Sequence, residues 1–376
     1  MSTLATNAIT DAIGGNTTTI NGYTPTMSNM AGRNRIINGD MRIDQRNAGA
    51  SYSQSTSAIY GLDRWKGDID TGTGRWDVQQ VSDAPVGFSN SLKVTITTQE
   101  SQPTSARHQI YQPIEGYNIS DLGFGTANAS PITVSFWVKT SVTGIHSVNV
   151  ASFDYVYTTS YTVNLADTWE YKTITIPGAT AGTWDSTNGG GLYLEFTLGG
   201  GTDQIVAANT WYSETSTGIV SDSVYLPATS GATWQITGVQ LEAGSVATPF
   251  EHRQYGQELA LCQRYYQKSY DYDTVPGTNT IVGSVTARGD ISSTMSNLPL
   301  GTRFVVTMRA VPTLVTYSKS GTSGAISNLG TSLGSQQSAV DTDVIGGLGT
   351  TGISYVNVVS ATGPGVSMHY TADAEL

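Results

Sequence analysis

The chain has 376 residues, of which only 12% are charged, and its formal net charge at pH 7 is −11. Nucleic-acid binding depends on a basic face that displaces counterions, so this acidic balance argues against nucleic acid as a partner. No run of about 18 apolar residues predicts a membrane span, and no basic, apolar leader predicts secretion. The single cysteine, Cys262, allows no intrachain disulfide, and we expect synthesis in the cytoplasm.

The first 32 residues contain one charged side chain, Asp11, and their apolar residues are scattered among Thr, Asn and Gly. That is too little apolar surface to close a core. Two interpretations stay open: a disordered tail, or an extended arm that orders only against other chains. The turn sequences "GGN" and "NGYTP" favour the arm, and we assign its contacts to Ile9, Ile13 and Ile20.

The stretch "AGRNRIINGDMRIDQRNAG", residues 31–49, predicts a hairpin. Asn38-Gly39 is a strong two-residue turn signal, because both central positions favour positive φ. Four arginines flank the turn and suit a fixed junction, since guanidinium groups make planar bidentate contacts. They can pair with Asp40 and Asp44 or with acidic groups of a neighbouring subunit, and a solvated charged face is the alternative. These junction candidates are Arg33, Arg35, Arg42 and Arg46.

From about residue 52 to 250, alternating apolar residues predict one strand after another. The clearest runs are "SLKVTIT", "ITVSFWVK" and "LYLEFTL", each with one apolar face. In "WQITGVQL" the alternation shifts by one residue at Gly238, which predicts a β-bulge. Many short strands and glycine-rich turns predict an all-β fold built on an antiparallel jelly-roll sandwich.

One helix is expected, in "QYGQELALCQRYYQ", residues 254–267. Its apolar side chains recur at a seam spacing, so it packs either on the sandwich or on copies of itself about a symmetry axis. The seam residues are Tyr255, Leu259, Cys262 and Tyr266. Strand patterns then return and predict a smaller C-terminal β-sandwich. The expected division is an arm over 1–32, a jelly roll over 33–253, a connecting helix over 254–269 and a β domain over 270–376.

A search for reactive groups finds no catalytic signature. The four histidines lie far apart, and no zinc-ligand spacing occurs. Asp68, Asp70 and Gly72 resemble the start of an EF-hand loop, but its twelfth position is Gln79 instead of glutamate. A calcium ion held by jelly-roll loops stays open, with no ligands assigned. We therefore expect no catalytic residue, no assigned metal site and no cofactor.

Aromatic residues are the better candidates for binding. A ring exposed on a sheet can stack on the apolar face of a sugar while polar neighbours bond its hydroxyls. The alternation places Trp137 and Tyr193 on the outer faces of their strands, and Trp184 lies near a turn. These three are the carbohydrate-binding candidates, and the alternative is that such rings fill the rim of the core or a subunit interface.

Several motifs together resemble the tail-fibre-like virion proteins of tailed bacteriophages, notably those of cyanobacterial and marine phages. The resemblance runs from about residue 15 to the end, and its most specific parts are the arginine-rich stretch, "GVQLEAGSVATPFEHR" and "ELALCQRYY". It implies a homotrimeric fibre whose arm attaches to other virion proteins, in the tail, collar or capsid, while its β domains project outward. The sandwich also resembles carbohydrate-binding modules, whose closing strand is similar to "WQITGVQLE".

Three functions follow from these expectations. The first is a receptor-binding fibre on the virion surface that adheres to polysaccharide of the host cell. The second is a structural head fibre, collar fibre or capsid decoration that binds only virion proteins. The third, a polysaccharide depolymerase, is disfavoured because neither β-helix repeats nor a carboxylate pair emerges from the sequence.

Overall fold

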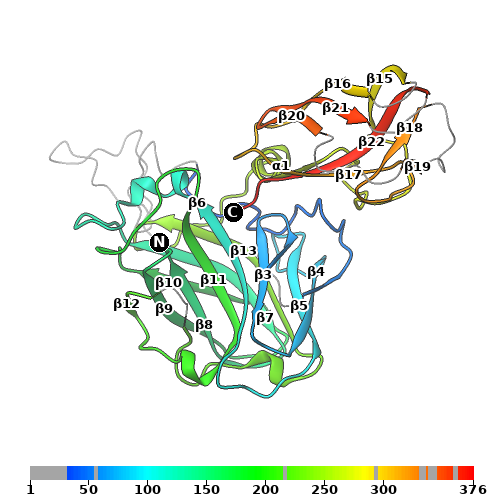
Figure 1. Ribbon diagram of the computed structural model, residues 1–376. Coiled ribbons are helices and arrows are strands. Elements are labelled where there is room, and N and C mark those ends of the chain that lie inside the picture. Colours follow the sequence, from blue (N-terminus) through cyan, green and yellow to red (C-terminus); the bar gives the residue numbers. More distant parts are fainter. Residues whose placement is uncertain are drawn as a thin grey trace, which may run out of the picture.

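The computed structural model describes residues 32–54, 58–214, 218–291, 295–329, 336–337, 345–358 and 363–376 (Figure 1). Its strands pair antiparallel in four sheets, which confirms the all-β prediction. The expected arm, with Ile9, Ile13 and Ile20, lies outside the described residues except for Gly32. Within the described part, α1 (Tyr255–Gln263) is the single α-helix, and no helix there has the length and apolarity to cross a membrane.

Two sheets face each other and form the sandwich. The first has six strands in the order β1-β4-β5-β13-β7-β10, and the second has seven in the order β12-β9-β8-β11-β6-β3-β2. The first sheet consists of β1 (Tyr52–Gln54), β4 (Arg75–Val81), β5 (Ser91–Thr98), β13 (Thr233–Ala243), β7 (Ile132–Thr140) and β10 (Glu170–Ile176). The second consists of β12 (Thr210–Tyr212), β9 (Val156–Val163), β8 (Gly144–Ala151), β11 (Gly190–Gly200), β6 (Arg107–Glu115), β3 (Trp65–Asp70) and β2 (Ile59–Leu62).

The core of the sandwich lies between these sheets and follows the predicted alternation. Phe136 of β7 meets Phe196 of β11 edge to face, with ring centroids 5.0 Å apart, and both are fully buried. Trp234 of β13 completes this contact from the first sheet, at 5.7 Å from Phe196. Short 3-10 helices cap the ends of the sandwich: η1 (Gly116–Asn118), η2 (Ser120–Leu122), η3 (Thr202–Gln204) and η4 (Leu226–Ala228).

The predicted bulge at Gly238 is confirmed. The pairing of β13 with β7 shifts register between Thr237 and Gln240, and Gly238 has φ +62°. A Cβ at this position would lie 2.7 Å from Cζ of Phe88. The bulge returns Val239 and Leu241 to the core, where both are fully buried.

Replacing Gly238 with alanine is expected to lower the free energy of unfolding by about 1–2 kcal/mol, because a side chain at left-handed φ is strained. Gly256, in α1, is the matched control, since its φ is not positive and a Cβ there meets nothing within 4 Å. Alanine at Gly256 is expected to stabilise by about 0.5–1 kcal/mol. Urea unfolding of the two variants tests whether the free energy of unfolding falls in one and rises in the other. Equal changes would contradict the assignment of a strained left-handed backbone to Gly238.

Two further sheets follow α1. In the larger, β22 (Gly363–Asp373) is the central strand and pairs with β14, β15, β17 and β18. Its members are β14 (Tyr266–Lys268), β15 (Val285–Ile291), β17 (Thr313–Tyr317), β18 (Ile326–Asn328) and β19 (Gln336–Gln337), besides β22. The three-stranded sheet has the order β16 (Met295–Arg303), β21 (Gly352–Val358) and β20 (Ile345–Gly349). Figure 1 shows these elements, coloured yellow to red, beside one end of the sandwich.

The arginine-rich stretch does not form the expected hairpin. Residues 32–50 contain turns and no strand, because the polar side chain of Asn38 closes the loop instead of a strand ladder. Asn38 has φ +56°, its Nδ2 donates to the carbonyl of Ile43 at 2.8 Å, and its Oδ1 accepts from the Ile43 amide at 2.9 Å. This segment is a buried plug: Ile36 and Met41 enter the core of the sandwich, and Ile37 and Ile43 pack near α1.

The arginines of this plug bind groups of their own chain. Arg42 pairs with Asp40, as expected, whereas the Asp44 carboxylate accepts from the Asn47 and Gly49 amides. Arg35 pairs with Asp121 at 2.5 Å, and Arg33 donates to the Pro249 carbonyl at 2.7 Å. Arg46 reaches Asp373 and Glu375, at 2.8 and 3.1 Å, and so joins the plug to the end of the chain.

The predicted helix seam also needs correction. The helix ends at Gln263, and Tyr266 lies in β14 instead. Cys262 is fully buried and packs with Ile37, Ile43 and Tyr265 of the same chain. Because two of the four seam residues are thus buried inside one chain, Tyr255, Leu259, Cys262 and Tyr266 do not form a common exposed stripe for contact with other copies.

Candidate functional site

A groove on the outer face of the second sheet combines aromatic rings with hydrogen-bonding groups. We call it the tyrosine groove, and its volume is about 200 Å³. Tyr111 and Tyr193 supply its rings, with centroids 6.5 Å apart and planes tilted by 46°. Phe153, 80% exposed, stands at the rim. The groove is lined by Asp68, Arg107, Gln109, Tyr111, Ala151, Ser152, Phe153, Tyr193 and Glu195.

Strand register brings these side chains together. Arg107, Gln109 and Tyr111 occupy alternate positions of β6 and therefore share its outer face. In the antiparallel pairing, Tyr111 lies opposite Glu195 of β11, and Gln109 lies opposite Asp68 of β3. Three strands that are distant in sequence thus contribute one row of polar and aromatic groups, in which Gln109 and Glu195 are buried and Arg107, Tyr111, Asp68 and Tyr193 are half-buried.

The environment of the tyrosine groove keeps its phenols protonated. Burial, together with the nearby Asp68 and Glu195 carboxylates, raises the pKa of Tyr111. Burial raises the pKa of Tyr193 as well, with a smaller contribution from Glu195. Burial also raises the pKa of Asp68, against the attraction of Arg107. Both phenols are therefore hydrogen-bond donors at neutral pH, next to carboxylate acceptors and a guanidinium donor.

A second groove lies on the outer face of the first sheet, and we call it the aromatic groove. Its volume is about 550 Å³, and the described residues that line it include no Asp, Glu, Lys or Arg. Trp137 and Tyr171 lie with ring centroids 5.3 Å apart, and Phe88 lies 5.2 Å from Phe250. The lining consists of Val86, Gly87, Phe88, Trp137, Tyr171, Thr173, Gly238, Ala247, Thr248, Pro249, Phe250 and His252.

The three aromatic candidates from the sequence lie in three different places. Trp137 lines the aromatic groove, and Tyr193 lines the tyrosine groove on the other sheet. Trp184 packs edge to face against Phe124 at 4.7 Å and against Trp211 at 5.8 Å, and its Nε1 donates to the Ala181 carbonyl at 3.0 Å. Those contacts match the alternative interpretation, in which a tryptophan fills the rim of the core.

Sequence reasoning missed most of the tyrosine groove. Tyr193 shares the groove with Tyr111, Arg107, Asp68 and Glu195. None of these four was predicted to bind carbohydrate, and Asp68 was considered only in the rejected EF-hand motif. One available signal was the alternation of Arg107, Gln109 and Tyr111 in "RHQIYQP", which predicts a polar, aromatic outer face for that strand. The pairing of that strand with "LYLEFTL" cannot be seen in a single sequence.

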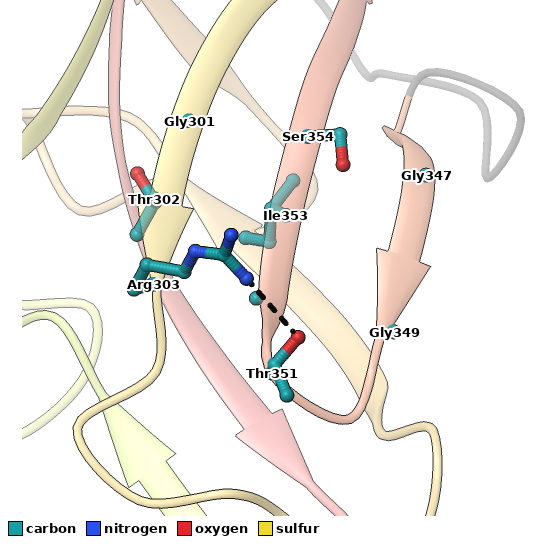
Figure 2. A pocket seen from close by; sticks show the side chains of 9 residues that line it. Gly301, Thr302, Arg303, Gly347, Gly349, Thr351, Ile353 and Ser354 are labelled. Carbon is teal, nitrogen blue, oxygen red and sulfur yellow. Dashed lines mark hydrogen bonds between the residues drawn. The ribbon is translucent and has the colours of Figure 1, made fainter.

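A third pocket, of about 240 Å³, lies at the end of the three-stranded sheet. Figure 2 shows the Arg303 side chain extending across it toward Thr351, and its Nη1 donates to Thr351 Oγ1 at 3.3 Å. Glycines line much of the remainder, at positions 301, 347, 349 and 352. The described lining has no aromatic ring, so this pocket offers no stacking surface.

His108 and Glu100, whose pKa values are both shifted, belong to a largely buried structural network. The fully buried His108 contacts Glu100 at 3.2 Å, and Tyr225 donates to the same carboxylate at 2.8 Å. Burial opposes ionisation of Glu100, but hydrogen bonds from Thr73, Tyr225 and Gly74 lower its pKa to about 2. Burial lowers the pKa of His108 against its attraction to Glu100. Within the described ranges, no cluster of three His, Cys, Asp or Glu side chains could hold a metal ion.

Comparison with known proteins gives similarities to solved structures only: no family model and no curated protein matches this chain. A tailspike protein 4 domain of bacteriophage CBA120 is 13% identical over 56% of this chain and 21% of its own, with a TM-score of 0.26. A family 11 carbohydrate-binding module from Clostridium thermocellum is 14% identical over 54% and 98%, with a TM-score of 0.27. A putative sugar binding protein from Bacteroides thetaiotaomicron is 12% identical over 56% and 100%, with a TM-score of 0.33. This chain thus spans about a fifth of the tailspike chain, and at such low TM-scores none of these likenesses carries a functional argument.

Proposed function

We propose that this protein binds glycan in the tyrosine groove. The observation that carries the proposal is the pair of tilted rings, Tyr111 and Tyr193, set beside Arg107, Asp68 and Glu195 in one groove on the outer face of the second sheet. A sugar presents C–H groups on its faces and hydroxyls at its edge. Aromatic rings pack against the C–H groups, and carboxylates, amides and guanidinium groups form hydrogen bonds with the hydroxyls.

We further propose that the protein is a homotrimeric fibre on the surface of a tailed-bacteriophage virion. The motif resemblance supports this role, with residues 1–32 attached to other virion proteins and the β regions over 33–253 and 270–376 projecting toward the host. A single small sugar site commonly binds at about millimolar Kd, or about −4 kcal/mol. Three copies in one fibre raise the apparent affinity about 10²- to 10⁴-fold when they engage together.

The proposed role is adhesion without cleavage. The carboxylates of the tyrosine groove, Asp68 and Glu195, line it together with Arg107 and two phenols, and we assign them to recognition. A depolymerase would reduce the viscosity of host polysaccharide during incubation with the protein. We expect the viscosity to stay constant while the protein co-sediments with the same polysaccharide.

Alanine at Tyr193 or Tyr111 is expected to weaken glycan binding about 5- to 30-fold, because each change removes a stacking ring worth about 1–2 kcal/mol. A panel of host-surface polysaccharides first identifies the ligand, and calorimetry with the trimer-competent full chain then measures the affinity. Trp137→Ala, on the other sheet, is the matched control and should leave that affinity unchanged.

Two outcomes would contradict the tyrosine groove as the glycan site. If Trp137→Ala abolished binding while the tyrosine variants bound normally, the glycan site would lie on the other sheet. If no host polysaccharide bound at all and only virion proteins did, the structural head-fibre or collar-fibre role would replace adhesion.

A further inference from the structure

The aromatic groove has a chemistry unlike that of the tyrosine groove. Its described lining has no Asp, Glu, Lys or Arg, and the Thr248 hydroxyl already donates to Glu242 at 2.6 Å. Val86 is fully exposed and Tyr171 is 45% exposed at its edges. An occupant therefore gains by burying apolar surface and finds few partners for hydroxyl groups.

The described chain begins at the rim of this groove. The Gly32 amide donates to Glu251 Oε1 at 2.6 Å, and the Asn34 amide donates to Oε2 of the same carboxylate at 2.8 Å. Arg33 donates to the carbonyl of Pro249 at 2.7 Å, and Pro249 and Phe250 line the groove. The first described residues therefore lie beside Pro249 and Phe250.

The sequence just before Gly32 has the composition that such a groove favours. Residues 23–31 read "YTPTMSNMA" and contain no charged side chain, in agreement with a lining that has no Asp, Glu, Lys or Arg. Met27 and Met30 have flexible thioether side chains, which fill irregular apolar spaces and contact aromatic rings favourably. At about 3.4 Å per extended residue, they reach up to roughly 17 and 7 Å from Gly32.

We infer that residues 23–31 occupy the aromatic groove of their own chain, with Met27 and Met30 packed among Trp137, Phe88 and Phe250. The tether at Gly32 gives this segment a high effective concentration at the groove, which favours it over a free ligand of equal affinity. A glycan suits the groove less well, because few of the lining groups can bond its hydroxyls. The inference is independent of glycan binding in the tyrosine groove.

This docking would give the leading segment a defined direction. The aromatic groove lies on the first sheet and the tyrosine groove on the second, so the two face opposite sides of the sandwich. Residues 1–22, including Ile9, Ile13 and Ile20, would then leave the sandwich on the side away from the tyrosine groove. Attachment through the arm and recognition at the groove could proceed on one chain without obstruction.

Cross-linking of the full chain tests the docking. The single natural cysteine, Cys262, is fully buried, so the introduced cysteines are the ones that the reagent reaches. A chain with Met30→Cys and Val86→Cys is treated with a short bis-maleimide and analysed by peptide mass spectrometry. The matched control combines Met30→Cys with Val311→Cys, since Val311 is also exposed, at 59%, but lies outside the groove. We expect at least 5-fold more cross-link at Val86 than at Val311, and equal yields would overturn the inference.

Two further measurements fix the identity of the occupant. In a mixture of isotopically heavy and light chains, docking within one chain gives cross-linked peptide pairs that are both heavy or both light. Cross-links that mostly join a heavy peptide to a light one would assign the groove to a second copy and overturn the proposal. Met27→Ser with Met30→Ser should speed alkylation of the Val86→Cys thiol several-fold. Ile9→Ser with Ile13→Ser should leave that rate unchanged, and an equal acceleration by both pairs would contradict docking through the methionines.

Discussion

Replacing Glu375 with alanine is expected to lower the free energy of unfolding by about 3–5 kcal/mol, because the change leaves a buried arginine without its counter-charge. Glu375 pairs with Arg64, and the side chains of these residues are only 4% and 1% exposed. Arg64 also donates to the Pro113 carbonyl, and its guanidinium lies 3.6 Å from the centre of the Tyr265 ring. None of these neighbours can neutralise the charge once the carboxylate is gone.

Asp373 supplies a matched control on the same network. It pairs with Arg46 at 2.8 Å, as Glu375 does at 3.1 Å, but the Asp373 side chain is 37% exposed. Solvent screens an exposed pair, so Asp373→Ala is expected to cost at most about 1 kcal/mol. If Asp373→Ala and Glu375→Ala lowered the free energy of unfolding equally, burial of the Arg64–Glu375 pair would not determine how much that pair stabilises the fold.

Urea unfolding followed by two signals measures the loss of stability in Glu375→Ala and shows which part of the chain loses it. All seven tryptophans lie between Trp65 and Trp234, so tryptophan fluorescence follows the sandwich, whereas circular dichroism follows every sheet. In the wild-type chain the two transitions should coincide. In Glu375→Ala we expect them to separate, because the altered residue joins the sandwich to the C-terminal sheets.

The junction around Glu375 accounts for Arg46, one of the four arginines in the stretch that follows the leading segment. Arg46 and Arg64 bind acids of residues 373–375, and Arg264 makes two contacts with Glu115 of β6, at 3.0 and 2.6 Å. Figure 1 shows the end of the chain lying between the sandwich and the C-terminal sheets. The cations therefore hold two β regions of one chain together, and a role in contacts between subunits stays a prediction.

The sandwich could be predicted from the sequence because its signals are local. Alternation in β7 and β11 requires only side chains two residues apart, and the shift at Gly238 interrupts that alternation within one strand. The hairpin prediction failed because Asn38 uses its own side chain to close the loop, through the amide and carbonyl of Ile43. Propensity at Asn38-Gly39 identified a turn but not the structure on either side of it.

The candidate sites were harder to predict from the sequence, because they depend on contacts between residues that are distant in the chain. Tyr193 could be placed on an outer face from its strand alone, but its partner Tyr111 becomes a neighbour only through the pairing of β11 with β6. The partner of Arg46 at Asp373 is more than 300 residues away, and no local rule selects it. Sequence patterns therefore identify the type of residue at a site before they identify the site.

The carboxylate of Asp63 gives the junction a pH dependence that a single substitution can isolate. Asp63 is fully buried and accepts hydrogen bonds from the Gln45 amide at 2.7 Å and from Gln45 Nε2 at 2.6 Å. Burial raises its pKa to about 6, against the opposing charge of Arg46 and these hydrogen bonds. The unfolded chain has the ordinary aspartate pKa of about 3.9.

The sign of the effect follows from proton binding. Between these two pKa values the folded chain binds more protons than the unfolded chain, so the contribution of Asp63 to stability is full below about pH 4 and is lost as the pH rises through 6. The loss amounts to about 2–3 kcal/mol, at 1.36 kcal/mol for each pKa unit. Asp63→Asn removes the titration, so its free energy of unfolding minus that of the wild type should increase by this amount from pH 4 to pH 7.

Asp83 supplies a control of opposite sign for this titration. Its hydrogen bond from Lys139 lowers the pKa of the Asp83 carboxyl, so its contribution is present at neutral pH and is lost on acidification. Urea unfolding of wild type, Asp63→Asn and Asp83→Asn at half-unit pH steps should therefore give difference curves of opposite slope. A flat curve for Asp63→Asn would mean that the carboxyl ionises as easily in the fold as in the unfolded chain, and that burial beside Arg46 carries no net electrostatic cost.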